Sequence, residues 1–181
     1  MKAKTIIYGI ILIFVFSIVL GLTGNTNDVE HASAEVPVVV EEEPTVQDVI
    51  KSEIKKEGTW DANLDSYTVG YNDETRTLSI DMVYHDPLNA KSFRKVMNYN
   101  TMEMLEVVSK HQADVDYVFI TGYTDMMDQQ GNVNTDRVYY VQVGTERASQ
   151  VNWNNLMGSE DMEQAIRNNV DSMWMHPGVR G

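Results

Sequence analysis

The pattern of hydrophobic and polar positions begins with an apolar run at residues 6–22, which follows Lys2 and Lys4. As a helix, this run would rise about 26 Å at roughly 1.5 Å per residue, slightly less than a bilayer core of about 30 Å. Because the cations precede the run, the positive-inside rule predicts a cytoplasmic amino terminus and transfer of the remaining chain across the membrane. The sequence therefore predicts a signal peptide or a single-pass membrane anchor at residues 1–22.

Two fates of this segment stay open. Ala32, Ser33 and Ala34 form a small-residue site of the kind that signal peptidase cleaves. The polar or small residues 23–34 separate this site from the apolar run, however, and that distance is longer than usual. Cleavage near Ala34 would give a secreted protein, and retention would give a membrane-anchored one. Both alternatives predict an extracytoplasmic carboxyl-terminal domain.

Residues 23–44 differ in composition from what precedes and follows them. Residues 35–44 contain two prolines and four glutamates, which favours an extended, self-repelling segment. We therefore interpret residues 23–44 as an extended acidic linker. The alternative is that the valines at 38–40 add an edge strand to the following domain.

Residues 45–181 alternate between helical and strand periods. Apolar residues at helical spacing end at Gly58, which predicts a helix from about residue 45 to 57. A hairpin with strands near 67–71 and 77–84 follows, because apolar and polar residues alternate on both sides of a turn. Next comes a long amphipathic stretch, roughly 88–111, which predicts the helix that covers the sheet.

A second hairpin is predicted at residues 115–123 and 134–145. In its first strand Tyr117 and Phe119 alternate with Val118 and Ile120, so both faces of this strand require cover. The last region predicts a helix that Ser159 caps and whose apolar residues continue at helical spacing to Trp174. The fold class is thus α+β: a four-stranded, mainly antiparallel sheet packed on helices, in the order α-ββ-α-ββ-α, within one domain at 45–181.

Composition restricts the chemistry. The chain has 181 residues, no cysteine and a formal net charge of −13, and the residues beyond Ala34 keep that charge because the preceding segment holds two acids and two bases. Without cysteine there is no disulfide, no thiolate metal site and no lipid-bearing cysteine. An acidic domain repels phosphate backbones, so nucleic acid is not an expected partner.

The hairpin at 115–145, the Asn152-Trp153 step and the ending Trp174-Met175-His176-Pro177 resemble a group of small exported proteins and lipoproteins of Gram-positive bacteria whose role is unassigned. The resemblance implies a location in the cell envelope and gives no chemistry. This chain differs from the group because it lacks the lipid-bearing cysteine.

Candidate metal and catalytic motifs are few. The histidines at 31, 85, 111 and 176 lack zinc-ligand spacing. Asn132, Asn134 and Asp136 begin like a calcium loop, but Arg137 and Val143 occupy the positions of its glycine and closing glutamate, which favours a plain hairpin turn. No cofactor is therefore predicted.

The cluster around Trp174 has ligands that suit copper(I): Met173, Met175 and His176. Two thioethers and an imidazole are soft enough to hold this ion outside a reducing cytoplasm. The alternative interpretation is that the methionines fill gaps in the core.

The sequence favours a non-enzymatic module of the cell envelope that binds a protein or a wall component through exposed aromatic residues. The candidate anchors are Tyr123, Tyr139, Tyr140 and Trp153. One alternative is an exported metal- or ligand-binding protein that uses the copper(I) cluster. Another is an extracytoplasmic enzyme that uses carboxylates, which would require at least two acids to converge in one concave pocket.

Overall fold

The structure of the chain, a computed structural model, describes residues 43–57, 66–85 and 89–180. The predicted signal or anchor, the cleavage site near Ala34 and the linker up to residue 42 therefore lie outside the described residues. Within the part of the chain that is described, no helix combines the length and the apolar character needed to cross a membrane.

Helices and strands alternate along the chain in the order α-ββ-α-ββ-ααα-β-α, apart from one short 3-10 turn after α3. Their bounds are α2 (Val46–Glu57), β1 (Ser66–Asn72), β2 (Thr77–Tyr84), α3 (Ala90–Val108), η1 (Ser109–His111), β3 (Tyr117–Met127), β4 (Val133–Gly144), α4 (Thr145–Ala148), α5 (Trp153–Leu156), α6 (Met162–Asn169), β5 (Ser172–Met175) and α7 (Pro177–Arg180).

The two longest helices begin at side-chain caps. At α2, Thr45 and Asp48 bond reciprocally, because the Asp48 carboxylate accepts from Thr45 N at 3.2 Å and the Thr45 hydroxyl accepts from Asp48 N at 3.2 Å. The Asn89 side chain accepts from Ser92 N at 2.9 Å and caps α3. The predicted first helix and long helix are thus confirmed, with ends shifted by a few residues.

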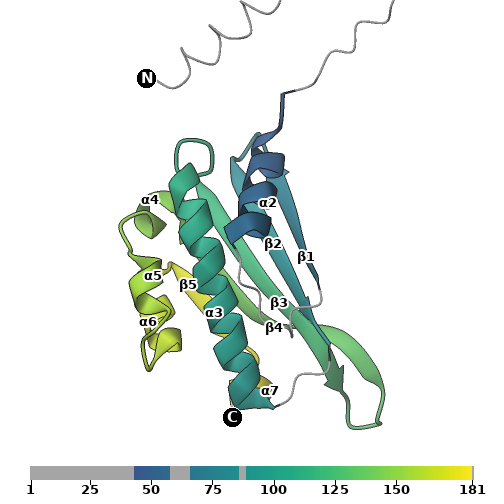
Figure 1. Ribbon diagram of the computed structural model, residues 1–181. Helices are drawn as coiled ribbons and strands as arrows, with labels where there is room; N and C mark the ends of the chain where they lie inside the picture. Colours follow the sequence, from purple (N-terminus) through teal and green to yellow (C-terminus); the bar gives the residue numbers. More distant parts are fainter. Residues whose placement is uncertain (1–42, 58–65, 86–88, 181) are drawn as a thin grey trace, which may run out of the picture. The chain divides into compact units, whose positions relative to one another are not determined.

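The sheet has five strands in the order β1-β2-β3-β4-β5 and is mixed (Figure 1). Three neighbouring pairs are antiparallel, but β2 and β3 are parallel. The reason is that α3 runs back along the sheet between them, as the connection between parallel strands requires. The α+β class is confirmed, and the prediction of four mainly antiparallel strands is corrected to a mixed sheet of five.

The fifth strand replaces the end of the predicted last helix. Asp161, not Ser159, caps α6, and the helix ends before Val170, whose backbone is extended (φ −116°, ψ 164°). Residues 172–175 then pair with β4. The apolar side chains of Val170, Met173 and Trp174 fit a helical spacing in the sequence, but Met173 and Met175 alternate across a strand in the structure.

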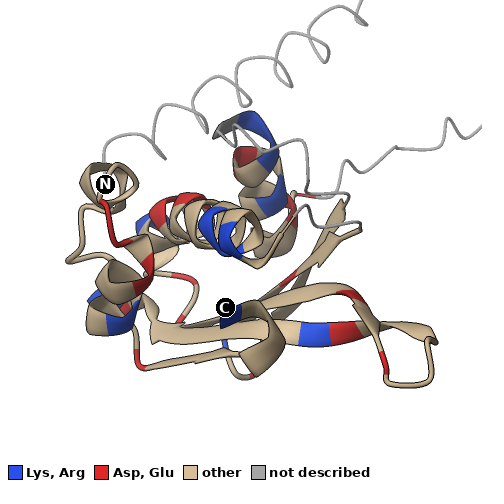
Figure 2. Ribbon diagram, turned by 90° about the horizontal axis from the view of Figure 1, so that it is seen from below, with Lys and Arg blue, Asp and Glu red and all other residues tan. Residues whose placement is uncertain are grey.

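The described helices lie on one face of the sheet (Figure 2). The strand residues on that face are buried with them; they include Leu78, Ile80, Val118, Ile120 and Val141. Among the described residues no helix covers the opposite face, which we call the open face. One-sided cover of this kind leaves alternate strand residues facing water.

Candidate functional site

Five aromatic side chains lie on the open face, at alternate positions of β3, β4 and β5. We call this set the aromatic surface: Tyr117, Phe119, Tyr123, Tyr140 and Trp174. Tyr117 is 46% exposed and Trp174 37% exposed, and the other three are half-buried. Tyrosine and tryptophan are enriched at interfaces, so their grouping on a face that no described helix covers marks a candidate interface.

The strand register makes the aromatic surface continuous. Tyr140 of β4 lies opposite Trp174 of β5 and opposite Thr121 of β3. Phe119, two residues before Thr121, stacks on Tyr140 with ring centroids 6.1 Å apart and planes at 26°. The surface therefore crosses three adjacent strands.

A β-bulge brings Arg137 to the same face. Tyr139 lies opposite Gly122 while Arg137 lies opposite Tyr123, so Val138 is the extra residue in β4. Val138 and Tyr139 both point into the core as a result. The Arg137 guanidinium carbon lies 5.8 Å from the ring centroid of Tyr140 and 5.7 Å from that of Trp174, which is within cation–π range.

Polar side chains border the aromatic surface. His85 Nδ1 and Asp125 Oδ2 are 2.9 Å apart, and the Thr135 hydroxyl donates to Asp125 Oδ1 at 2.8 Å. These hydrogen bonds, first from His85 and then from Thr135, lower the pKa of Asp125. On the side of β2, Ser79 and Asp81 lie opposite Phe119 and Thr121.

Of the four predicted anchors, two lie on the aromatic surface and two lie in the core. Tyr123 and Tyr140 are on the aromatic surface. The predicted exposure of Tyr139 and Trp153 is wrong, because both side chains are completely buried. The bulge turns Tyr139 toward the core, and the Trp153 indole N–H donates to the carbonyl of Ala148 at 2.9 Å.

Sequence reasoning missed three members of the aromatic surface as anchors: Tyr117, Phe119 and Trp174. The alternation of Tyr117 and Phe119 with Val118 and Ile120 was a sufficient signal for the first two. Trp174 was missed because a helix was predicted where the structure has β5.

The structure does not bring the predicted copper(I) ligands, Met173, Met175 and His176, together at one site. Met175 is buried in the core and Met173 packs against it, whereas Trp174, between them, faces the other way. The His176 ring lies beside Trp174, with centroids 6.1 Å apart, and its Nδ1 accepts from Gly178 N at 3.0 Å. The strand thus places the thioethers and the imidazole on opposite sides.

Acidic residues elsewhere have structural contacts. Asp128 closes the β3–β4 hairpin, because its carboxylate accepts from Gln130 N and Asn132 N, which agrees with the predicted plain turn. No group of three or more histidine, aspartate or glutamate side chains within the described ranges is arranged to hold a metal ion.

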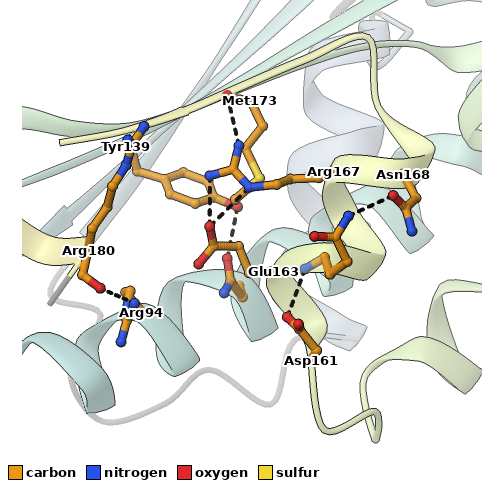
Figure 3. Close-up of polar contacts among 10 residues, drawn as sticks. Arg94, Tyr139, Asp161, Glu163, Arg167, Asn168, Met173 and Arg180 are labelled. Atoms are coloured by element: carbon orange, nitrogen blue, oxygen red, sulfur yellow. Dashed lines mark hydrogen bonds and ion pairs between the residues drawn. The ribbon is translucent and has the colours of Figure 1, made fainter. Parts of the chain in front are cut away.

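A groove of about 810 Å³ lies on the helix side, between α3 and the start of α6. Three acids line it, Glu160, Asp161 and Glu163. Asp161 accepts from Gln164 N at 2.9 Å and caps α6. Glu163 accepts from Arg167 Nη2 at 2.7 Å and from its Nε at 3.0 Å, and Figure 3 shows this pair beside Tyr139. Two of the three carboxylates therefore have structural roles in α6.

In comparisons with known proteins, no family model, no curated protein and no solved structure matches the chain. The fold and the site define the chain as an α+β domain with a mixed sheet that is covered on one face and carries an aromatic surface on the other.

Proposed function

We propose that this protein is a non-enzymatic binding module of the bacterial cell envelope, and that its aromatic surface binds a wall component or an envelope protein. The observation that supports the proposal best is the position of Tyr117, Phe119, Tyr123, Tyr140 and Trp174 together on the open face. Tyrosine and tryptophan contribute strongly to interface energies, since each buries a large area and loses few rotamers.

The location outside the cytoplasm is supported by sequence alone. The apolar run at 6–22 behind Lys2 and Lys4 predicts that the following chain crosses the membrane. The terminal motif around Trp174 resembles that of small exported Gram-positive proteins. Pull-down from intact cells with a carboxyl-terminal tag, followed by intact mass, tests partner and processing together: loss of residues 1–34 would indicate secretion, and their retention an anchor.

Binding is tested with the purified full chain, kept in mild detergent, and isolated cell walls that are sedimented. We expect Trp174→Ala and Tyr117→Ala each to weaken co-sedimentation about tenfold or more, which corresponds to roughly 1.4 kcal/mol of binding free energy. Two variants on different strands are used because Trp174 lies on the short edge strand β5.

Val133→Ala is the matched control. Val133 is an apolar residue, 58% exposed, at the tip of the β3–β4 hairpin and outside the aromatic surface. We expect its co-sedimentation to stay within twofold of the wild type. If the two aromatic variants bind walls and captured envelope proteins as well as this control does, the aromatic surface is not the binding site.

The two alternative functions have less support. A copper(I) site would require Met173, Met175 and His176 to converge, and β5 directs them apart. A carboxylate enzyme would require acidic side chains that are available to react. Asp161 instead caps α6, and Glu163 forms an ion pair with Arg167 of the same helix. The binding module is therefore the function that the geometry favours.

A further inference from the structure

Aromatic rings, rather than a carboxylate, hold Arg137 on the open face. Its guanidinium contacts the rings of Tyr140 and Trp174. Contacts of this type orient the plane of the guanidinium and leave its in-plane N–H donors available. Among the residues that the structure describes, none forms a hydrogen bond or an ion pair with Arg137.

Most other arginines of the domain have polar partners. Arg76, Arg147 and Arg167 pair with Asp116, Asp171 and Glu163, and Arg94 donates to the carbonyl of Arg180. In a chain of net charge −13, carboxylates are plentiful. An exposed guanidinium that is oriented by two rings of a candidate interface, and that forms no ion pair with a carboxylate of the described residues, indicates that an anionic group of the ligand is its partner.

The net negative charge of the chain limits which kinds of anion can bind near Arg137. Because screening limits surface electrostatics to about 8–10 Å, one isolated anion that reaches Arg137 is attracted, whereas a dense row of phosphates is repelled by the acidic remainder. The planar fork of a guanidinium matches a carboxylate through two parallel hydrogen bonds. The charge pattern thus favours single, spaced carboxylates over a polyphosphate.

The remainder of the open face suits a sugar chain. The aromatic rings offer apolar surfaces for the C–H groups of sugars, and nearby Ser79 and Gln142 offer a hydroxyl and an amide group on the same face. Phe119, Tyr140 and Trp174 are on neighbouring strands, which lie about 4.8 Å apart, close to the length of one sugar ring. A chain that crosses the strands places successive rings on successive aromatic residues.

On these grounds, and resting on the function proposed above, we propose that the ligand is a wall-type glycan that carries isolated carboxylates, and that Arg137 binds the carboxylate while the aromatic surface around it contacts the sugar rings. Arg137 is thus a specificity-determining residue, and the ligand class is a carboxylated glycan rather than a neutral one.

The test uses a matched ligand pair. The probes are a tetrasaccharide of alternating N-acetylglucosamine and N-acetylmuramic acid, whose lactyl groups carry the carboxylates, and its methyl ester, which has the same rings without the charge. Affinities for the purified full chain are measured by titration calorimetry and by intrinsic tryptophan fluorescence. We expect the wild type to bind the acid roughly tenfold more tightly than the ester.

The measured quantity is the ratio of the two affinities in each protein, because this ratio isolates the coupling between Arg137 and the carboxylate from any effect of Arg137 on the rings. We expect Arg137→Gln to bring the ratio close to one and Arg137→Lys to leave an intermediate ratio, since lysine keeps the charge but lacks the fork. A wild-type ratio near one, or a ratio unchanged in Arg137→Gln, overturns this inference.

The outcomes separate this inference from the proposed function. If the acid and the ester bind equally and Trp174→Ala abolishes both, the aromatic surface binds glycan but Arg137 does not select a carboxylate. If an acidic extended peptide binds through Trp174 and neither sugar does, the partner is a protein and the glycan assignment is wrong. If Trp174→Ala changes no binding to walls, sugars or proteins, the proposed function itself fails.

Discussion

The hydroxyl of Tyr139 donates a hydrogen bond to Asn98 Oδ1 at 3.2 Å, and so joins β4 to α3 inside the core. Tyr139 is fully buried and Asn98 is 4% exposed. Burial raises the pKa of the Tyr139 hydroxyl well above its ordinary value of 10.0. The neutral, buried phenol of Tyr139 thus lies on the helix-covered face of the sheet. Its neighbour in the chain, Tyr140, lies on the opposite face and belongs to the aromatic surface.

We expect Tyr139→Phe to lower the free energy of unfolding at pH 7 by about 1–2 kcal/mol, because the Asn98 oxygen would lose its donor in a buried environment. Urea unfolding followed by circular dichroism measures the change. Tyr117→Phe, which removes a hydroxyl from an exposed ring, is the matched control and should stay within about 0.5 kcal/mol of the wild type. Equal effects of the two variants would contradict the prediction.

Tyr139 also makes the fold sensitive to alkali. Its folded-state pKa is raised above the unfolded value of 10.0, so the stability that depends on the neutral phenol is intact below pH 10 and is lost as pH rises above it. One such group contributes up to about 1.4 kcal/mol per pH unit. We therefore expect the difference in unfolding free energy between the wild type and Tyr139→Phe to shrink from pH 9 to pH 11. A constant difference over this range would show that the raised pKa is absent.

The helices α2 and α3 and the first four strands could be predicted from the sequence because each shows a helical or a strand period, whereas the four-residue helices α4, α5 and α7 are too short to show one. Residues 46–57 repeat apolar side chains at helical spacing, and the residues of β2 alternate strictly. The parallel pairing of β2 and β3 could not be predicted, because alternation within a strand does not depend on the direction of its neighbour. The last strand was missed because it begins only three positions after the end of α6 and its apolar residues have a spacing that also fits a helix.

The candidate site was only partly predictable for the same reason. Tyr139 and Tyr140 are adjacent, so one of them must point into the core in any strand, and the composition does not say which. The bulge at Val138 decides it. Arg137 gave no sequence signal as part of the site, since it is three positions from Tyr140, an odd spacing that puts two residues of a regular strand on opposite faces, and only the bulge places both on one face.

Gly122 of β3 lies where the sheet packs tightly against Met97 of α3. A Cβ at this position would lie 3.0 Å from Met97 Sδ of α3 and 3.0 Å from Tyr139 Cβ. The methionine can move, but the tyrosine Cβ is fixed by the backbone of β4. We expect Gly122→Ala to lower the free energy of unfolding by about 1–3 kcal/mol, as overpacking does.

Gly158→Ala serves as the control for this substitution, because a Cβ there would meet nothing within 4 Å. It should change the unfolding free energy by less than about 0.5 kcal/mol. If the two alanine variants unfold at the same urea concentration, α3 is farther from β3 than the structure places it.

Asp171 fixes the start of β5 and thereby the position of Trp174. Its Oδ2 accepts from Gly144 N at 2.8 Å, and its Oδ1 pairs with Arg147 Nη1 at 2.9 Å. Because the two side chains are 39% and 47% exposed, the charge contribution is screened and the hydrogen bond to the backbone is the larger part. We expect Asp171→Ala to cost about 1 kcal/mol of unfolding free energy.

We also expect Asp171→Ala to have a local effect on β5. Residues Ser172–Met175 form a short edge strand that pairs only with β4 in the described part of the sheet. Loosening Asp171, the residue before this strand, should therefore speed amide hydrogen exchange in β5 more than in β3. Asp116→Ala, which breaks the exposed Arg76–Asp116 pair, is the control and should leave β5 protected. If exchange in β5 is unchanged in Asp171→Ala, the strand is held by its pairing with β4 alone, and Asp171 has no role in positioning Trp174.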